Sequence, residues 1–206
     1  MTTTDTDNRV PTPAPDGRSM WRLGLVLFLA SLTVFFVGAL VVYIFTAVGR
    51  PPLEGVNAHG LPSMMWLSTL LLLLSGLSIE AGARLSKGAR MAETARWLTI
   101  AAALGILFVL TQTVAISQLM GDHQLERTRP VLGLSGLTFV MILIHALHVV
   151  GGLIPLAILV HKARNSRLSL EHIPAVRGCA TYWHFLEVVW LTMFLLFWIT
   201  TRSPAG

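Results

Sequence analysis

The chain alternates long apolar stretches with short segments that hold nearly all of its charges. A fifth apolar stretch, 178–201, is interrupted by one charged residue, Glu187. Each stretch is longer than the roughly 20 residues that a helix needs to cross the hydrocarbon core of a bilayer. The pattern therefore predicts an all-α integral membrane bundle of five transmembrane helices, at about 22–48, 61–84, 97–120, 131–160 and 179–201. The four stretches that contain no Asp, Glu, Lys or Arg are 23–49, 55–79, 97–121 and 130–161.

Composition agrees with this pattern and leaves little chain for a soluble domain. Hydrophobic residues make up 54% of the 206 and charged residues 12%, whereas soluble domains carry about 25% charged residues. Residues 1–20 are rich in Thr, Asp and Pro, which predicts a disordered cytoplasmic tail, and 21–202 form the transmembrane domain. The first apolar stretch is too long for the core of a signal peptide, so we expect it to stay as a helix.

The distribution of basic residues predicts the orientation of the bundle. If the N-terminus lies inside the cell, eleven of the fifteen Lys and Arg residues fall on that side and four fall outside. Inner loops usually carry the excess of positive charge, so we expect the N-terminus inside and the C-terminus outside. The basic pI of about 10.3 is then a consequence of topology, and it gives no reason to propose nucleic acid as a partner.

Two predicted helices carry ionisable residues near their middle. His145 and His148 are three residues apart in the fourth helix, and His184 and Glu187 are three apart in the fifth. A charge at the bilayer centre costs at least about 2.5–3.5 kcal/mol, so it usually faces protein and has a partner. We interpret these residues as a polar seam that fixes helices, with Glu187 accepting hydrogen bonds from His148 or His145, or that contacts lipid or another subunit. The seam residues are His145, His148, Tyr182, Trp183, His184 and Glu187.

Two other functions are open on the residues alone. His184 with His145 or His148 could ligate a haem, as in a membrane b-type cytochrome, although two His three apart on one helix cannot bind one iron from opposite sides. The same residues with Glu187 could bind a metal, although carboxylate di-metal bundles need more acids than this helix pair supplies. Glu80 lies near a predicted helix end, where we expect it to pair with Arg84 beside water.

Two motifs resemble those of a known family. Tyr182-Trp-His-Phe-x-Glu-Val-Val-Trp190 is similar to the signature near the end of subunit III of the haem–copper terminal oxidases. Ile144-His-Ala-Leu-His-Val149, followed by Gly152, resembles the penultimate-helix motif of that family. The likeness covers roughly 20–202, in the short five-helix form common in bacteria.

The resemblance implies a non-catalytic subunit of a respiratory oxidase in the bacterial plasma membrane. Such a subunit would carry no haem, copper or other metal of its own and would have no active site. It would pack in a complex with subunits I and II, bind phospholipid, and support proton uptake, assembly and durability while the complex passes electrons from cytochrome c to oxygen. A quinol oxidase or nitric-oxide reductase accessory subunit is the alternative within this class.

The chain departs from the pattern of that family at several positions, which include Leu32, Arg177 and the third-helix segment 114–117. Leu32 and Arg177 stand where the family usually has acids, so the roles of those acids do not transfer to this chain. Glu187 stands where Asp is more usual, which adds one methylene group and leaves the carboxylate in place.

Overall fold

The computed structural model describes residues 17–48, 63–88, 90–124, 134–165 and 169–202. All five long elements are helices that are long and apolar enough to cross a membrane, and the described residues contain no strand. The structure therefore confirms the predicted all-α, five-helix class. The helices are α1 (Gly17–Val48), α2 (Ser63–Lys87), α3 (Met91–Gln124), α4 (Leu134–Arg164) and α5 (Ile173–Arg202), with a short 3₁₀ turn at Leu170–His172 before α5.

At the connections from α2 to α3 and from α4 to α5, the observed helices extend beyond the predicted apolar stretches. The last helix begins at Ile173 rather than at 179, and α3 begins at Met91 rather than at 97. Charged residues can continue a helix, because its hydrogen bonds join backbone groups and need no apolar side chain. The predicted tail is already helical from Gly17, and residues 1–16 lie outside the described part of the chain.

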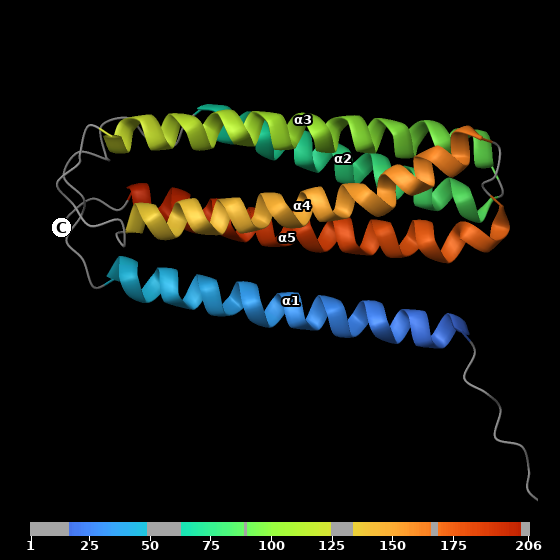
Figure 1. The fold of residues 1–206 in the computed structure, drawn as a ribbon, viewed down its shortest axis with the longest axis horizontal. Helices are drawn as coiled ribbons and strands as arrows, with labels where there is room; N and C mark the ends of the chain where they lie inside the picture. Colours follow the sequence, from blue (N-terminus) through green and yellow to red (C-terminus); the bar gives the residue numbers. More distant parts are fainter. Residues whose placement is uncertain (1–16, 49–62, 89, 125–133, 166–168, 203–206) are drawn as a thin grey trace, which may run out of the picture.

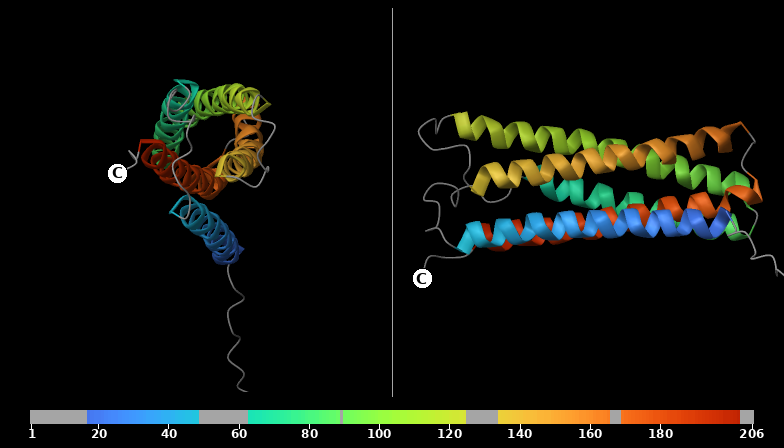
Figure 2. Two further views of the ribbon diagram at one scale, coloured as in Figure 1. Left: turned by 90° about the vertical axis from the view of Figure 1, so that its left-hand side faces the viewer. Right: turned by 60° about the horizontal axis from the view of Figure 1, so that its bottom comes forward.

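Helices α2, α3, α4 and α5 form a ring, and α1 lies outside it beside α5 (Figure 1; Figure 2, left). Around the ring α2 packs on α3, α3 on α4, α4 on α5 and α5 on α2, while α1 packs on α4 and α5. Helices α4 and α5 therefore have three neighbours each, and α1 has two. Together α4 and α5 join the ring to the outer helix.

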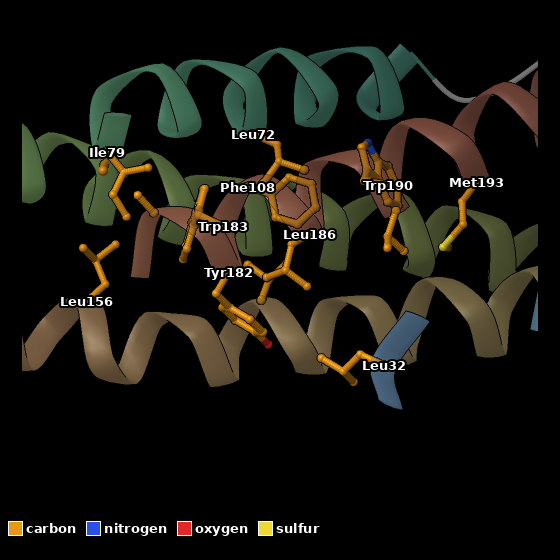
Figure 3. Packing of buried hydrophobic residues seen from close by; sticks show 14 of the residues in the cluster. Leu32, Leu72, Ile79, Phe108, Leu156, Tyr182, Trp183, Leu186, Trp190 and Met193 are labelled. Atoms are coloured by element: carbon orange, nitrogen blue, oxygen red, sulfur yellow. The ribbon is translucent and has the colours of Figure 1, made fainter. Parts of the chain in front are cut away.

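Large aromatic side chains fill the inside of the ring. Trp183 and Trp190 of α5 are fully buried, as is Phe108 of α3 (Figure 3). The rings of Phe108 and Trp190 meet edge to face, with their centroids 5.6 Å apart. Such pairs stabilise packing beyond the area that they bury. The core thus depends on two tryptophans that a single helix supplies.

Helix α1 rests on the ring through one narrow stripe. Leu32, Phe36 and Tyr43 are buried, whereas Val34 and Phe45 on other faces are 74% and 76% exposed. The Tyr43 hydroxyl lies 3.0 Å from Oγ1 of Thr200 in α5, which ties the two helices near one end. Most of the exposed side chains of α1 are apolar, as expected for a helix that faces lipid or another membrane protein.

Glycine is required where aromatic side chains of α5 approach the neighbouring helices. A Cβ at Gly105 of α3 would lie 2.9 Å from the ring of Trp183, and one at Gly152 of α4 would lie 2.7 Å from the ring of Tyr182. At the adjacent Gly151 a Cβ would meet nothing within 4 Å. Small residues of this kind let membrane helices approach closely.

We predict that Gly152→Ala lowers the free energy of unfolding by about 1–3 kcal/mol, because the Tyr182 ring must move to accommodate the methyl group. The matched variant Gly151→Ala should leave stability unchanged or raise it slightly, since alanine is the better helix former. Denaturation of the detergent-solubilised protein, followed by circular dichroism, measures both. Equal stability of the two variants would contradict the close approach at Gly152.

Candidate functional site

A row of four ionisable side chains joins α5 to α2. Nδ1 of His184 lies 2.7 Å from Oε2 of Glu187, one turn further along the same helix. Nε2 of His184 lies 3.5 Å from Oε2 of Glu80 in α2. Nε of Arg84 donates a hydrogen bond of 2.7 Å to the other Glu80 oxygen. The row runs from Arg84, near the end of α2, to Glu187, in the middle of α5.

The carboxyl group of Glu187 is held against the backbone of α2. Its side chain is 11% exposed, compared with 41% for His184 and 35% for Glu80. A Cβ added at Gly76 of α2 would overlap the Glu187 carboxyl group, so only glycine leaves room for it there. The second oxygen, Oε1, accepts no hydrogen bond from the described residues. Glu187 therefore sits in the α2–α5 contact, where His184 is its side-chain hydrogen-bonding partner.

The two histidines of α4 lie elsewhere. His145 is fully buried inside the ring, tilted against Trp190 at 5.3 Å between ring centroids and edge-on to Phe108 at 6.2 Å. Neither of its ring nitrogens has a hydrogen-bond partner among the described residues. His148 lies nearer α1, with its ring 5.3 Å from that of Phe36 and its Nδ1 2.8 Å from the Ile144 carbonyl oxygen.

The predicted hydrogen bond from His145 or His148 to Glu187 is therefore wrong. The Glu187 carboxyl group instead fits against Gly76 of α2 and contacts His184 of its own helix. The predicted pair of Glu80 and Arg84 is confirmed by the 2.7 Å hydrogen bond. The pattern does not predict the contact of Glu80 with His184, although the depths of the two residues are a usable signal: at 1.5 Å per residue they lie about 6 and 8 Å from the predicted helix ends at 84 and 179.

The structure divides the predicted seam into three parts. His184 and Glu187 face α2, whereas His145, His148 and Tyr182 lie where α4 and α5 meet, and Trp183 packs against the α3 and α4 glycines. The residues considered as haem or metal ligands are consequently not brought together. Among the described residues there is no group of three or more His, Cys, Asp or Glu side chains placed to bind a metal.

Two further hydrogen bonds of α5 cross to its neighbours in the ring. The Tyr182 hydroxyl donates to the carbonyl oxygen of His148 at 2.9 Å. The indole N–H of Trp190 donates to Oγ1 of Thr69 in α2 at 3.0 Å. Nothing in the pattern of residues marks Thr69, because a single threonine in an apolar helix usually bonds to its own backbone.

A groove of ≈ 570 Å³ lies between α1, α4 and α5. Its walls are mainly apolar and aromatic, and they include Trp21, Phe28 and Pro155. One end is polar, because Nζ of Lys162 lies there 3.2 Å from Nε2 of His172. The groove thus combines a long apolar surface with a cationic group near the ends of α4 and α5.

The part of the chain that the structure describes has five helices that are long and apolar enough to cross a membrane, and ionisable side chains of α2 and α5 contact each other. These features define a multi-pass membrane protein. Residues 16–201 match the family described as cytochrome c oxidase subunit III. The chain belongs to the cytochrome c oxidase subunit III family.

Individual relatives agree with this membership. The chain is 29% identical over 186 residues to cytochrome c oxidase subunit 3 of Chondrus crispus, covering 86% of this chain and 66% of the relative. It is 30% identical over 187 residues to that of Oryctolagus cuniculus, covering 86% and 69%. It is 26% identical over 181 residues to the protein named "Probable cytochrome c oxidase subunit 3" of Mycobacterium leprae (strain TN), covering 85% and 86%. The chain thus spans about two thirds of the length of the first two relatives.

We predict that Thr69→Val lowers the free energy of unfolding by about 1–2 kcal/mol, because it leaves the buried Trp190 N–H without its acceptor. Thr192→Val is the matched control, since the Thr192 hydroxyl donates to the Val188 carbonyl of its own helix at an exposed position. Denaturation curves in one detergent compare the two variants with the original chain. Equal losses would show that the interhelical bond to Trp190 contributes nothing specific.

Proposed function

We propose that this chain is the non-catalytic subunit III of a bacterial haem–copper oxidase that passes electrons from cytochrome c to oxygen. Membership of the subunit III family over 16–201 carries the proposal. In this role the chain lies in the bacterial plasma membrane beside subunits I and II, which hold the haem and copper. It supports assembly, proton uptake and the durability of subunit I.

The distribution of exposed side chains supports a place within a larger membrane complex. Glu80 and His184 remain about one third or more exposed in the isolated chain, although both belong to membrane-spanning helices. Ionisable groups in such positions almost always face protein or a water-filled cavity rather than lipid. A neighbouring subunit on the α2–α5 side would shield them from hydrocarbon.

We also propose that the groove between α1, α4 and α5 binds a phospholipid. Its apolar walls match acyl chains, and Lys162 is placed to contact an anionic head group at the polar end. Ammonium groups attract the phosphate of lipids near a membrane surface. The aromatic residues Trp21 and Phe28 would hold the chains against α1, so a bound lipid would help to fix this outer helix.

Mass spectrometry of the complex that co-purifies with the tagged chain in mild detergent tests the oxidase assignment. We expect a large, many-helix haem–copper subunit together with a copper-binding partner. Recovery of a quinol-oxidising or nitric-oxide-reducing catalytic subunit instead would move the chain to that branch. Recovery of the chain alone, with a haem band in its reduced-minus-oxidised spectrum, would overturn the proposal in favour of a b-type cytochrome.

We predict that Lys162→Gln lowers the amount of anionic phospholipid retained by the purified protein at least several-fold. Lys87→Gln is the control, because Lys87 is an exposed basic residue at the end of α2, away from the groove. Lipid mass spectrometry after identical detergent washes gives the amount per chain. Unchanged retention in the Lys162 variant, or an equal loss in the control, would contradict head-group binding at Lys162.

A further inference from the structure

At the α2–α5 contact one imidazole lies between two carboxyl groups. Nδ1 of His184 faces Glu187 at 2.7 Å, and Nε2 faces Glu80 at 3.5 Å. Each ring nitrogen thus meets an acidic oxygen from a different helix. The arrangement is built by the fold, because Gly76 leaves the space into which the Glu187 carboxyl group fits.

Counting hydrogens shows that this arrangement needs an additional proton. A neutral imidazole has one N–H, and an ionised carboxylate has no donor. If both carboxyl groups are ionised and His184 is neutral, one ring nitrogen turns a lone pair toward a carboxylate oxygen. One more proton, on the imidazole or on either carboxyl group, replaces this repulsion with a hydrogen bond or an ion pair.

The net charge of the row favours the same conclusion. With the additional proton, the formal charges of Glu80, Arg84, His184 and Glu187 sum to zero. Without it the row carries a net charge of minus one inside two membrane-spanning helices. Because an unbalanced charge in the hydrocarbon region is costly, the proton stabilises the contact between α2 and α5.

The row also offers a route for that proton. Counted at 1.5 Å per residue from the nearby helix ends, Arg84 lies about 5 Å and Glu80 about 10 Å deep in α2, while His184 lies about 17 Å and Glu187 about 21 Å deep in α5. Side-chain exposure falls from 76% at Arg84 to 11% at Glu187. The groups therefore lead from the water layer at the end of α2 toward the middle of the membrane.

Several other ionisable groups of the surrounding helices make their contacts away from the row. Arg90, which precedes α3, forms an ion pair with Glu93 in the first turn of α3. On α4, His145 and His148 lie against the ring of Phe36. Helix α1 has no Asp, Glu, Lys, Arg or His between residues 23 and 48. Among the described residues, the charged groups that contact His184 are Glu80 and Glu187.

We propose that Glu80, His184 and Glu187 form a proton-binding site that takes up one proton from the end of the bundle where α2 finishes. A proton from water reaches the imidazole on its Glu80 side. The Nδ1–H bond can then break as an O–H bond forms at Glu187, which leaves a neutral imidazole and a protonated carboxyl group. No electrons are transferred and no other reactant is needed. This site is where the chain would support proton uptake by the complex, and this part of the inference rests on the proposed function.

Infrared difference spectroscopy of the full chain, with any subunits that co-purify, tests the site in lipid nanodiscs. Spectra recorded at neutral and alkaline pH should show the loss of one proton from imidazolium and carboxylic acid groups. His184→Gln and Glu187→Gln should abolish this difference, and Glu80→Gln should weaken it or move it to lower pH. Glu93→Gln is the matched control, because Glu93 pairs with Arg90 outside the row, and it should reproduce the original spectrum.

Superimposable difference spectra for the original chain and His184→Gln would overturn the proposal. If Glu187→Gln does not fold, the more exposed Glu80→Gln and His184→Gln still decide the question. In sealed vesicles that hold the chain in one orientation, a pH change on the Lys87 side alone should produce the spectral difference, and a response from the opposite side alone would contradict the route. Failure of these tests leaves the co-purification result untouched, so the proton site and the oxidase assignment can fail separately.

Discussion

The ring of four helices depends on the polar bonds that α5 makes to the helices on either side of it. Between membrane helices there is no strong hydrophobic driving force, because lipid is as apolar as the side chains themselves. Close approach at glycines and hydrogen bonds between helices must supply the specificity. Helix α5 provides both: Trp190 and His184 reach α2, Tyr182 reaches α4, and Trp183 fills the space above the α3 and α4 glycines.

The sequence predicts the helices well because the membrane imposes a length and an absence of charge on each of them. It predicts poorly which side of each helix faces the core, for the same reason. In a soluble helix the polar face marks the outside, but here both lipid and core accept apolar side chains, so the pattern around the axis carries little information. The pattern therefore predicts a partner for Glu187 on the wrong helix, α4. Its prediction of a pair between Glu80 and Arg84, which lie four apart on one helix, is correct.

The glycines also show that the sequence does not reveal which residues face each other between helices. Gly151 and Gly152 are neighbours in the sequence, and only the second faces an aromatic ring at close range. Gly76 lies in a leucine-rich stretch that offers no sign that a carboxyl group from α5 occupies the space beside it. Small residues mark helices that pack closely, but the side chain that fills each gap comes from a distant part of the chain.

Helix α5 combines ionisable and aromatic groups on the side that packs into the ring. Trp183, Glu187 and Trp190 follow one another at spacings of four and three residues, so they lie on one side of the helix, and the Glu187 carboxyl group fits against Gly76 of α2. His184 extends this contact outward to Glu80, and the outer part stays open in the isolated chain. The two tryptophans pack against residues of α3 and α4 through rings that carry no charge. A change of protonation at the Glu80–His184–Glu187 site can then alter the α2–α5 contact while Trp183 and Trp190 keep the ring packed.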